Sequence, residues 1–350
     1  MTPVSLRHNK CSYKPEYWKQ SMRINSKSCP YIVADIGGTN TRFGLVTEID
    51  AVQKTVVIEN QLTYESASLS SIEEAILRYK ESLGELKVNN ACIAIAGPVV
   101  GDRVTVTNLD WKFSIAEVKE KLCFDNLMII NDFAAYAYAI HYLDKSCFRS
   151  IRAGIAVENF PVAVLGPGTG FGSAMLINDG NKINVLALEG GHISLAANNA
   201  LQAAIKEYMS RRFDFVSIER VFSGPGLRYL YQALAAVEGT QPTKLRTSEI
   251  SQAALNDSDE LCVRTLSLFC SWLGSTTGDF ALTLGAQGGI YLGGGVLPRI
   301  ADFLMTSDFE SSFKAKGQMQ HYLENIPIQL ITKGNSALLG SAAWFEDNIN

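Results

Sequence analysis

The stretch Asp35-Ile36-Gly37-Gly38-Thr39-Asn40-Thr41-Arg42 is the most informative part of this chain for predicting its fold. Apolar runs flank it on both sides, so it predicts a turn between two strands. Glycine has no Cβ and lets amide N–H groups approach an anion closely, while Thr39 and Asn40 add neutral donors. Asp35 ends the first strand, where a carboxylate could hold Mg²⁺ or its water ligands. An ordinary tight hairpin remains the alternative for this octapeptide taken alone.

A second glycine-rich turn covers residues 166–172, and neither turn fits the two best-known phosphate motifs. The chain contains no Gly-Lys dipeptide, which excludes a P-loop. In the second turn Ser173 stands at the third glycine position of a dinucleotide fingerprint, and residues 174–177 predict a strand rather than the required helix. Both turns are therefore interpreted as strand-turn-strand units.

Composition narrows the class of protein and its partners. With 350 residues, 47% hydrophobic and 19% charged, the chain is long enough for about two globular domains with buried cores. A net charge of −4 argues against a nucleic-acid surface, and no apolar run approaches the length of a membrane span. Seven scattered cysteines without a Cys-x-x-Cys pair predict no zinc site and a reducing compartment, for which we expect the cytoplasm.

Residues 1–30 differ from the rest, with six Lys or Arg against one acid, Glu16. This basic, acid-poor balance loosely resembles a transit peptide, but the segment lacks the apolar region of a secretory signal. We favour the plainer interpretation: a disordered extension, or upstream sequence with Met22 as the working start.

Beyond residue 30, strands and helices alternate. Ser70 with Glu73 and Ser114 with Glu117 have the spacing of capping boxes and predict two helix starts. Both halves open with a strand pair around a glycine turn, which suggests a duplicated architecture. The expected elements are strands at 31–36, 41–47, 55–60, 91–95, 103–107, 127–130, 161–165, 173–177 and 289–292. The expected helices begin at 70, with an apolar face as far as 79, and lie at 114–122, 133–142, 199–211, 226–236, 247–256, 258–284 and from 298.

Polar side chains at strand ends and loops supply the candidate chemistry. Asp132 follows a buried strand beside Asn131 and could act as a base, although an Asp that only caps the next helix is the common alternative. In Glu189-Gly190-Gly191-His192 the two glycines argue against a helix and favour a tight loop that presents both side chains to one ligand. Glu219 precedes Arg220, where a surface salt bridge is the alternative. Carboxylates, a carboxamide and a His suit the binding of several sugar hydroxyls.

Eight motifs, in order, resemble those of bacterial-type glucokinases, within the hexokinase, actin and sugar-kinase superfamily. The resemblance covers about residues 31–345. The chain lacks the zinc-binding cysteine cluster of ROK kinases, and this places it in the non-ROK group. The motifs are Asp35–Arg42, Ala94–Pro98, Thr107-Asn108 with Trp111, Ile130–Phe133, Leu165–Gly172, Glu189–His192, Glu219–Gly226 and Gly293–Pro298.

The resemblance implies an α/β fold of two ribonuclease-H-like domains around a central cleft, and ATP-dependent phosphorylation of glucose at its 6-hydroxyl. It implies a small domain of residues 31–142 plus 333–350 and a large domain of 143–332. It makes Asp132 the catalytic base, and Asn131, Glu189, His192 and Glu219 the glucose ligands. The implied ATP site comprises Asp35, Ile36, Gly37, Gly38, Thr39, Asn40, Gly168, Thr169, Gly170, Gly293, Gly294 and Gly295, with Asp35 on Mg²⁺ directly or through water. We expect glucose and ATP or ADP as partners, a homodimer, no nucleic acid and no membrane.

Other functions remain open at this point. The substrate could be another hexose such as mannose or glucosamine. A non-catalytic ROK-type sugar sensor would need an N-terminal helix-turn-helix, which thirty residues without apolar periodicity cannot supply. An actin-like ATPase would have little use for Glu189, His192 and Glu219.

Overall fold

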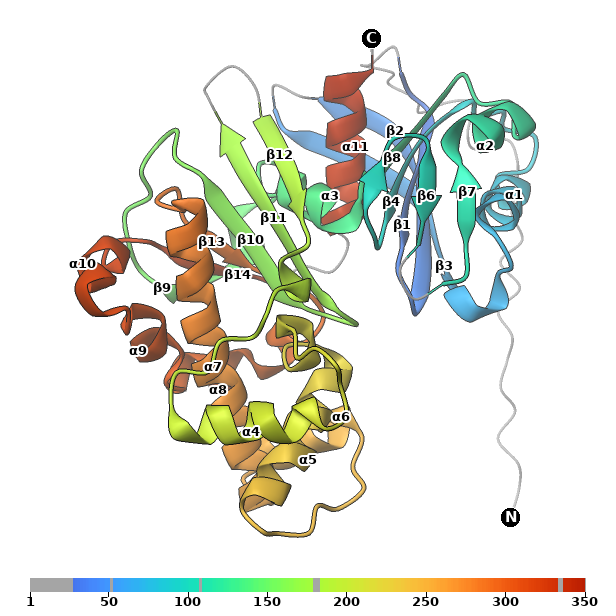
Figure 1. The fold of residues 1–350 in the computed structure, drawn as a ribbon. Coiled ribbons are helices and arrows are strands. Elements are labelled where there is room, and N and C mark those ends of the chain that lie inside the picture. The colour runs from blue at the N-terminus through green and yellow to red at the C-terminus, as the bar shows by residue number, and fades with distance from the viewer. Residues whose placement is uncertain (1–27, 51–52, 107–108, 179–182, 333–335, 350) are drawn as a thin grey trace, which may run out of the picture.

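The computed structural model describes residues 28–50, 53–106, 109–178, 183–332 and 336–349. Most of the expected basic extension and the pair Thr107-Asn108 lie outside the described residues. Figure 1 shows two halves, each built on one large sheet, with α3 and α11 between them. Among the described helices, none is both long and apolar enough to cross a bilayer.

The described strands form three sheets, ordered β3-β2-β1-β4-β8, β12-β11-β10-β13-β14-β9 and β5-β6-β7. Their bounds are β1 (Tyr31–Ile36), β2 (Asn40–Asp50), β3 (Thr55–Glu65), β4 (Asn90–Ile95), β5 (Val99–Val100), β6 (Arg103–Thr105), β7 (Lys112–Ser114), β8 (Asn126–Asn131), β9 (Phe148–Arg152), β10 (Val162–Pro167), β11 (Phe171–Asn178), β12 (Ile183–Leu188), β13 (Ile290–Leu292) and β14 (Ile328–Ile331).

The two large sheets repeat one topology. In the first, β1 pairs antiparallel with β2 and parallel with β4; in the second, β10 pairs antiparallel with β11 and parallel with β13. Each sheet therefore starts with a three-stranded antiparallel meander and adds two parallel strands on its other side, and the second sheet ends in an additional antiparallel strand, β9. The internal echo inferred from the two glycine turns is confirmed as a repeat of strand order.

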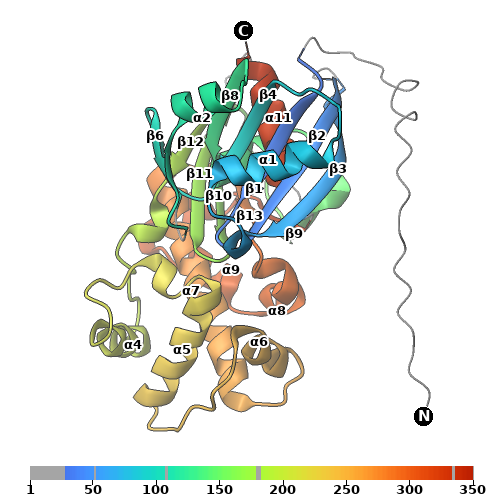
Figure 2. The same ribbon diagram turned by 90° about the vertical axis from the view of Figure 1, so that its right-hand side faces the viewer.

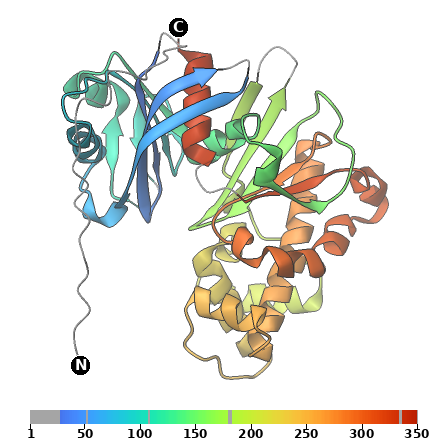
Figure 3. The ribbon, with the colours of Figure 1, turned by 180° about the vertical axis from the view of Figure 1, so that it is seen from behind.

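Helices cover both faces of the first sheet. Strand alternation divides β1: Ile32, Ala34 and Ile36 pack toward α1, whereas Tyr31 and Val33 pack toward α11. Figure 2 shows α1 in front of this sheet and α11 behind it, and Figure 3 shows α11, in red, from the back of the molecule. The helices are α1 (Ile72–Ser82), α2 (Ile115–Lys121), α3 (Asp132–Ala139), α4 (Ala200–Ser210), α5 (Gly224–Val237), α6 (Thr247–Leu255), α7 (Glu260–Leu284), α8 (Ala301–Thr306), α9 (Phe309–Lys314), α10 (Gln320–Leu323) and α11 (Ser336–Asn348).

Helix α3 belongs to the cores of both halves. Ala134 and Ala135 pack with α11 and the first sheet, whereas Ala137 packs with Val164 and Ala174 of the second sheet. A Cβ at Gly340 of α11 would overlap the carbonyl oxygen of Ala135, so the two helices pack at very short range. The residue that opens α3, Asp132, is therefore placed by contacts from both sheets.

Several expected elements need correction. The first capping box was expected at Ser70 and Glu73, but Ser71 accepts from the N–H of Glu74, and Glu74 accepts from the N–H of Ser70. The sequence has two serines followed by two glutamates, so both registers fit locally, and burial of Ile72 favours the second. The helix expected at 133–142 ends at Ala139, β3 runs to Glu65, and β9, β12, β14 and α11 were not predicted.

Candidate active site

Two adjoining cavities lie between the halves. The smaller, about 170 Å³, has walls of mixed polar and apolar character, and the larger, about 820 Å³, continues from it. Both are lined by Gly37, Gly38, Asp132, Gly168 and Thr169, which are all predicted site residues. Other predicted site residues line only one of the two cavities. The smaller is lined by Asn131, Gly170, Glu189, His192 and Glu219, and the larger by Asp35, Thr39, Asn40 and Gly295.

Asp132 stands at the junction of the cavities and is not the cap of its helix. Asn131 is the cap: its Oδ1 accepts from the N–H of Ala134 at 3.0 Å, and its Nδ2 donates to the carbonyl of Gly97 at 3.0 Å. The Asp132 Oδ1 accepts from the N–H of the next residue, Phe133, at 2.8 Å. The capping alternative for Asp132 is thus excluded, and Asn131 has both ends of its carboxamide engaged.

The surroundings of Asp132 raise its pKa to about 7. Burial is the main cause, because it removes water from the charged form, and the carboxylates of Asp35 and Glu189 add repulsion. Hydrogen bonds from backbone N–H groups oppose the shift. A carboxyl whose pKa lies near neutrality is suited to accept and release a proton during a reaction.

Asp35 faces the larger cavity and forms an ion pair with Arg42, whose Nη1 lies 3.2 Å from its Oδ2. Burial raises the pKa of Asp35, and the Arg42 guanidinium opposes that rise. The described residues contain no group of three or more His, Cys, Asp or Glu that could hold a metal. One cavity carboxylate suits a Mg²⁺ that arrives bound to phosphates, since Mg²⁺ commonly takes one or two protein carboxylates and completes its shell with phosphate and water.

Glycines of the second sheet make room for α3. A Cβ at Gly172 would overlap the ring of Phe133, and a Cβ at Gly293 would overlap the ring of Tyr136. Gly294 has a φ of +80°, which a side chain would strain. These close approaches hold the start of α3, and hence Asp132, against the second glycine turn and the glycines at 293–294.

Three predicted ATP residues do not line either cavity: Ile36, Gly293 and Gly294. Ile36 is fully buried on the α1 side of the first sheet, because alternation along β1 turns it away from the face of Asp35. Gly293 and Gly294 pack against Gly166 and Pro167 of the neighbouring strand.

Glu219 and Glu189 reach the smaller cavity from different segments. Glu219 lies in η5 (Ile218–Arg220), and its Oε2 accepts from the N–H of Phe171 at 2.8 Å, so it also fixes the second glycine turn. The Oε2 of Glu189 lies 3.7 Å from Nε2 of His192, and both side chains are more than half exposed. Residues 190–192 form one 3₁₀ turn, η4, where no helix was expected.

The glycines of η4 are required by packing. A Cβ at Gly190 would press on Phe280 of α7, and one at Gly191 would overlap the carbonyl oxygen of Phe171. The sequence correctly indicates a tight segment here, but the glycines serve close contact with α7 and β11. The 3₁₀ turn they permit directs Glu189 and His192 into one cavity.

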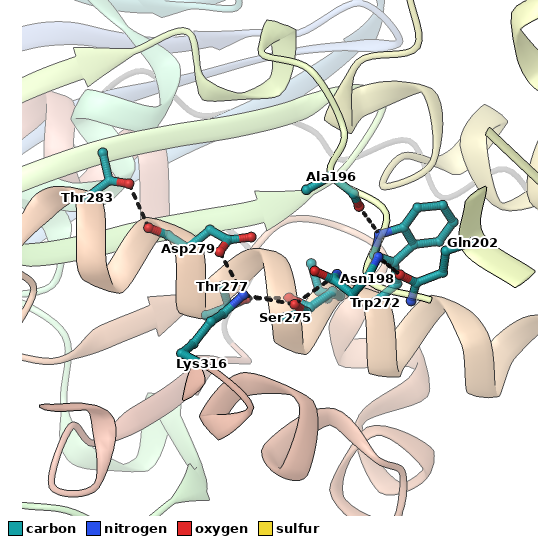
Figure 4. Close-up of polar contacts among 10 residues, drawn as sticks. Ala196, Asn198, Gln202, Trp272, Ser275, Thr277, Asp279, Thr283 and Lys316 are labelled. Carbon is teal, nitrogen blue, oxygen red and sulfur yellow. Dashed lines mark hydrogen bonds and ion pairs between the residues drawn. The ribbon is translucent and has the colours of Figure 1, made fainter. Parts of the chain in front are cut away.

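A polar network supports the segment that follows His192 (Figure 4). The Nζ of Lys316 donates to Asp279 at 2.6 Å and to Ser275 at 2.9 Å, and Asn198 donates to the same Ser275 hydroxyl at 3.1 Å. The indole of Trp272 donates to the carbonyl of Ala196 at 2.7 Å. Residues 196–198 are therefore tied to α7, the helix whose Phe280 supports Gly190.

Sequence reasoning missed the basic lining of the larger cavity. Arg42, Arg228, Arg246 and Arg299 all line it. Four guanidinium groups in one cavity lining favour an anionic ligand such as a polyphosphate. The four residues come from separate segments, and no spacing in the sequence indicates that they meet.

Comparisons with known proteins agree with this geometry. Residues 32–348 match the family model described as Glucokinase. The curated glucokinase of Saccharophagus degradans is 43% identical over 317 residues, which is 91% of this chain and 98% of that protein. The crystal structure of a glucokinase from an Antarctic psychrotroph has a TM-score of 0.80 at 45% identity, over 91% of this chain and 99% of that one.

A more distant structure shares the fold. A ROK family glucokinase from Streptomyces griseus, described in complex with glucose and AMPPNP, has a TM-score of 0.62 at 22% identity and covers 90% of this chain and 98% of its own. The expected α/β fold of two ribonuclease-H-like domains around a cleft is confirmed. From the match over nearly its whole described length, the chain belongs to the glucokinase family.

Proposed function

We propose that this chain transfers the γ-phosphoryl group of ATP to the 6-hydroxyl of glucose. The observation that carries this proposal is the position of Asp132, a carboxyl with a pKa of about 7. It lies at the junction of a small cavity that contains Glu189, His192 and Glu219 and a larger, arginine-lined one. Membership of the glucokinase family supports it, as does the Streptomyces griseus neighbour described with glucose and AMPPNP.

In this proposal the smaller cavity holds the sugar. Glu189, His192 and Glu219 bind its hydroxyls, since carboxylates accept and an imidazole donates or accepts. Asn131 uses one lone pair of Oδ1 on Ala134 and one N–H of Nδ2 on Gly97, so its second lone pair and its second N–H are left for the sugar. Asp132 takes the 6-hydroxyl proton while that oxygen bonds to the γ-phosphorus and the bond to the ADP oxygen breaks.

The larger cavity holds ATP. Phosphoryl transfer has a loose transition state, so catalysis depends on alignment and on neutralising phosphate charge. The first turn with Thr39 and Asn40, the second turn with Gly168 and Thr169, and the cavity arginines supply donors for that purpose. Mg²⁺, held through Asp35, would add charge neutralisation at the phosphates.

We also propose the two-domain division at 31–142 plus 333–350 and 143–332, with closure over the sugar to exclude water. In support, α11 packs on β1 and β4 of the first sheet, so the C-terminus returns to the N-terminal half. A homodimer and a cytoplasmic location are further proposals; the six described cysteines form no disulfide.

A coupled assay with purified protein, ATP, Mg²⁺ and a panel of glucose, mannose and glucosamine tests the function. We expect ADP release that depends on sugar, with the highest kcat/KM for glucose. A preference for another hexose would reassign the substrate. ADP release independent of sugar would favour an actin-like ATPase, and sugar binding without turnover would favour a sensor.

A further inference from the structure

Arginines and aromatic rings alternate from the end of α4 into the first turns of α5. The two helices pack against each other (Figures 1 and 2). The guanidinium of Arg220 lies 4.5 Å from the ring centre of Phe213, that of Arg212 lies 5.4 Å from Phe213 and 4.6 Å from Tyr229, and that of Arg228 lies 5.7 Å from Tyr229. The two rings meet edge to face at 5.1 Å. We name these five residues the arginine ladder.

The ladder carries positive charge that nearby acids do not neutralise. Within the described parts of the chain, no carboxylate forms an ion pair with its arginines or with the adjacent Arg211. Glu207 and Asp214 line a separate cavity together with Lys206, and Glu219 lines the sugar cavity. A stacked guanidinium keeps its in-plane N–H donors available, so Arg211 and Arg212 retain donors for an anion.

Beside the ladder lies a cavity of about 210 Å³ that has the lining of an anion site. Its charged residues are Arg211 and Arg212, and it contains no acid. The phenol of Tyr208 and the amide of Gln232 add neutral donors, and Met209, Phe213 and Tyr229 complete the wall. We propose that this cavity binds a phosphate group, either free phosphate or the phosphate of a small ester, between Arg211 and Arg212.

The two ends of the ladder lie next to the active site. Arg220 directly follows Glu219 in η5, and Glu219 lines the sugar cavity. Arg228 lies on α5 and lines the larger cavity. An anion that draws Arg212 toward it changes the stacking on both rings, so occupancy of the site alters the affinity for glucose or ATP.

Isothermal titration with inorganic phosphate, at saturating glucose and MgADP so that both active-site cavities are filled, tests the site. We expect one further binding event in the wild type, at least tenfold weaker in Arg212→Gln and unchanged in Arg103→Gln, an exposed arginine on β6. Arg212→Lys keeps the charge but loses the planar stack, so it should weaken binding less than Gln does. If Arg212→Gln does not fold, Arg211→Gln replaces it in the same titration and should show the same loss of phosphate affinity.

Absence of the event in the wild type, or equal affinity in wild type and both Gln variants, would overturn the site. Glucose 6-phosphate and AMP, titrated under the same conditions, distinguish free phosphate from a sugar ester and a nucleotide. The kinetic effect rests on the proposed kinase activity: phosphate should change the KM for glucose or ATP at least twofold in the wild type and not in Arg212→Gln. Binding without that change would refute the coupling and leave kinase activity untouched.

Discussion

The two large sheets share a strand order but use their glycine turns differently. At Gly37 of the first turn, the nearest atom to an added Cβ is the carbonyl oxygen of Asn40 at 3.3 Å, and the turn borders open cavity. At Gly172 of the second turn, an added Cβ would overlap the Phe133 ring. The same sequence signal therefore has two physical causes: Gly37 leaves room for a ligand, and Gly172 leaves room for a helix that carries the proposed base.

Replacement of the base itself should have the largest effect. Asp132→Asn keeps the shape of the side chain but cannot accept the proton, so kcat should fall by roughly 10² or more. Glucose binding, measured by tryptophan fluorescence or calorimetry, should persist. Turnover like that of the wild type would remove Asp132 from the mechanism.

Loss of a sugar ligand should have the next largest effect. Glu189→Ala or His192→Ala leaves a sugar hydroxyl unpaired, which costs about 1 to 3 kcal/mol and corresponds to a rise of roughly ten- to a hundredfold in the KM for glucose. The KM for ATP should change much less. Small-angle scattering should show compaction when glucose is added to the wild type, and little for His192→Ala at the same concentration.

Adding one methyl group at each of the two glycines, by substitution with alanine, tests the difference between the turns. Gly172→Ala should destabilise the fold by about 1 to 3 kcal/mol, because Phe133 must move. Gly37→Ala should leave the melting temperature nearly unchanged and raise the KM for ATP. In Gly172→Ala, the added change Phe133→Ala should recover part of the lost stability, since it removes the overlap. Equal stability losses in the two single variants would erase the distinction.

The pH dependence of stability tests the charge state of the proposed base. The pKa of Asp132 in the folded chain, about 7, exceeds its ordinary value of about 4, so the group destabilises the fold as pH rises through that window. Asp132→Asn lacks this charge. The excess of its melting temperature over that of the wild type should be larger at pH 8 than at pH 5, and should disappear only below about pH 4. An excess of the same size at both pH values would show that Asp132 stays charged throughout.

The sequence alone determined the main elements and much of the candidate site. Hydrophobic periodicity and turn residues predicted the strand pairs and the long helix α7, because these depend on neighbours in the chain. Of the predicted site residues, Asp132, Glu189, His192 and Glu219 line one cavity. Side chains alternate between the two faces of a strand, so the sequence of β1 already indicates that Ile36 points away from the face of Asp35. Ile36 could therefore have been excluded from the predicted ATP-binding residues.

Tertiary structure decided what depends on atoms distant in sequence. The pKa of Asp132 follows from burial and from Asp35 and Glu189, which lie 97 and 57 residues away along the chain. The arginine lining of the larger cavity, the packing role of Gly172 and Gly293, and the transfer of the helix cap to Asn131 have the same origin. A local pattern fixes which chemical groups are present; their charge state and exposure depend on which elements fold against them.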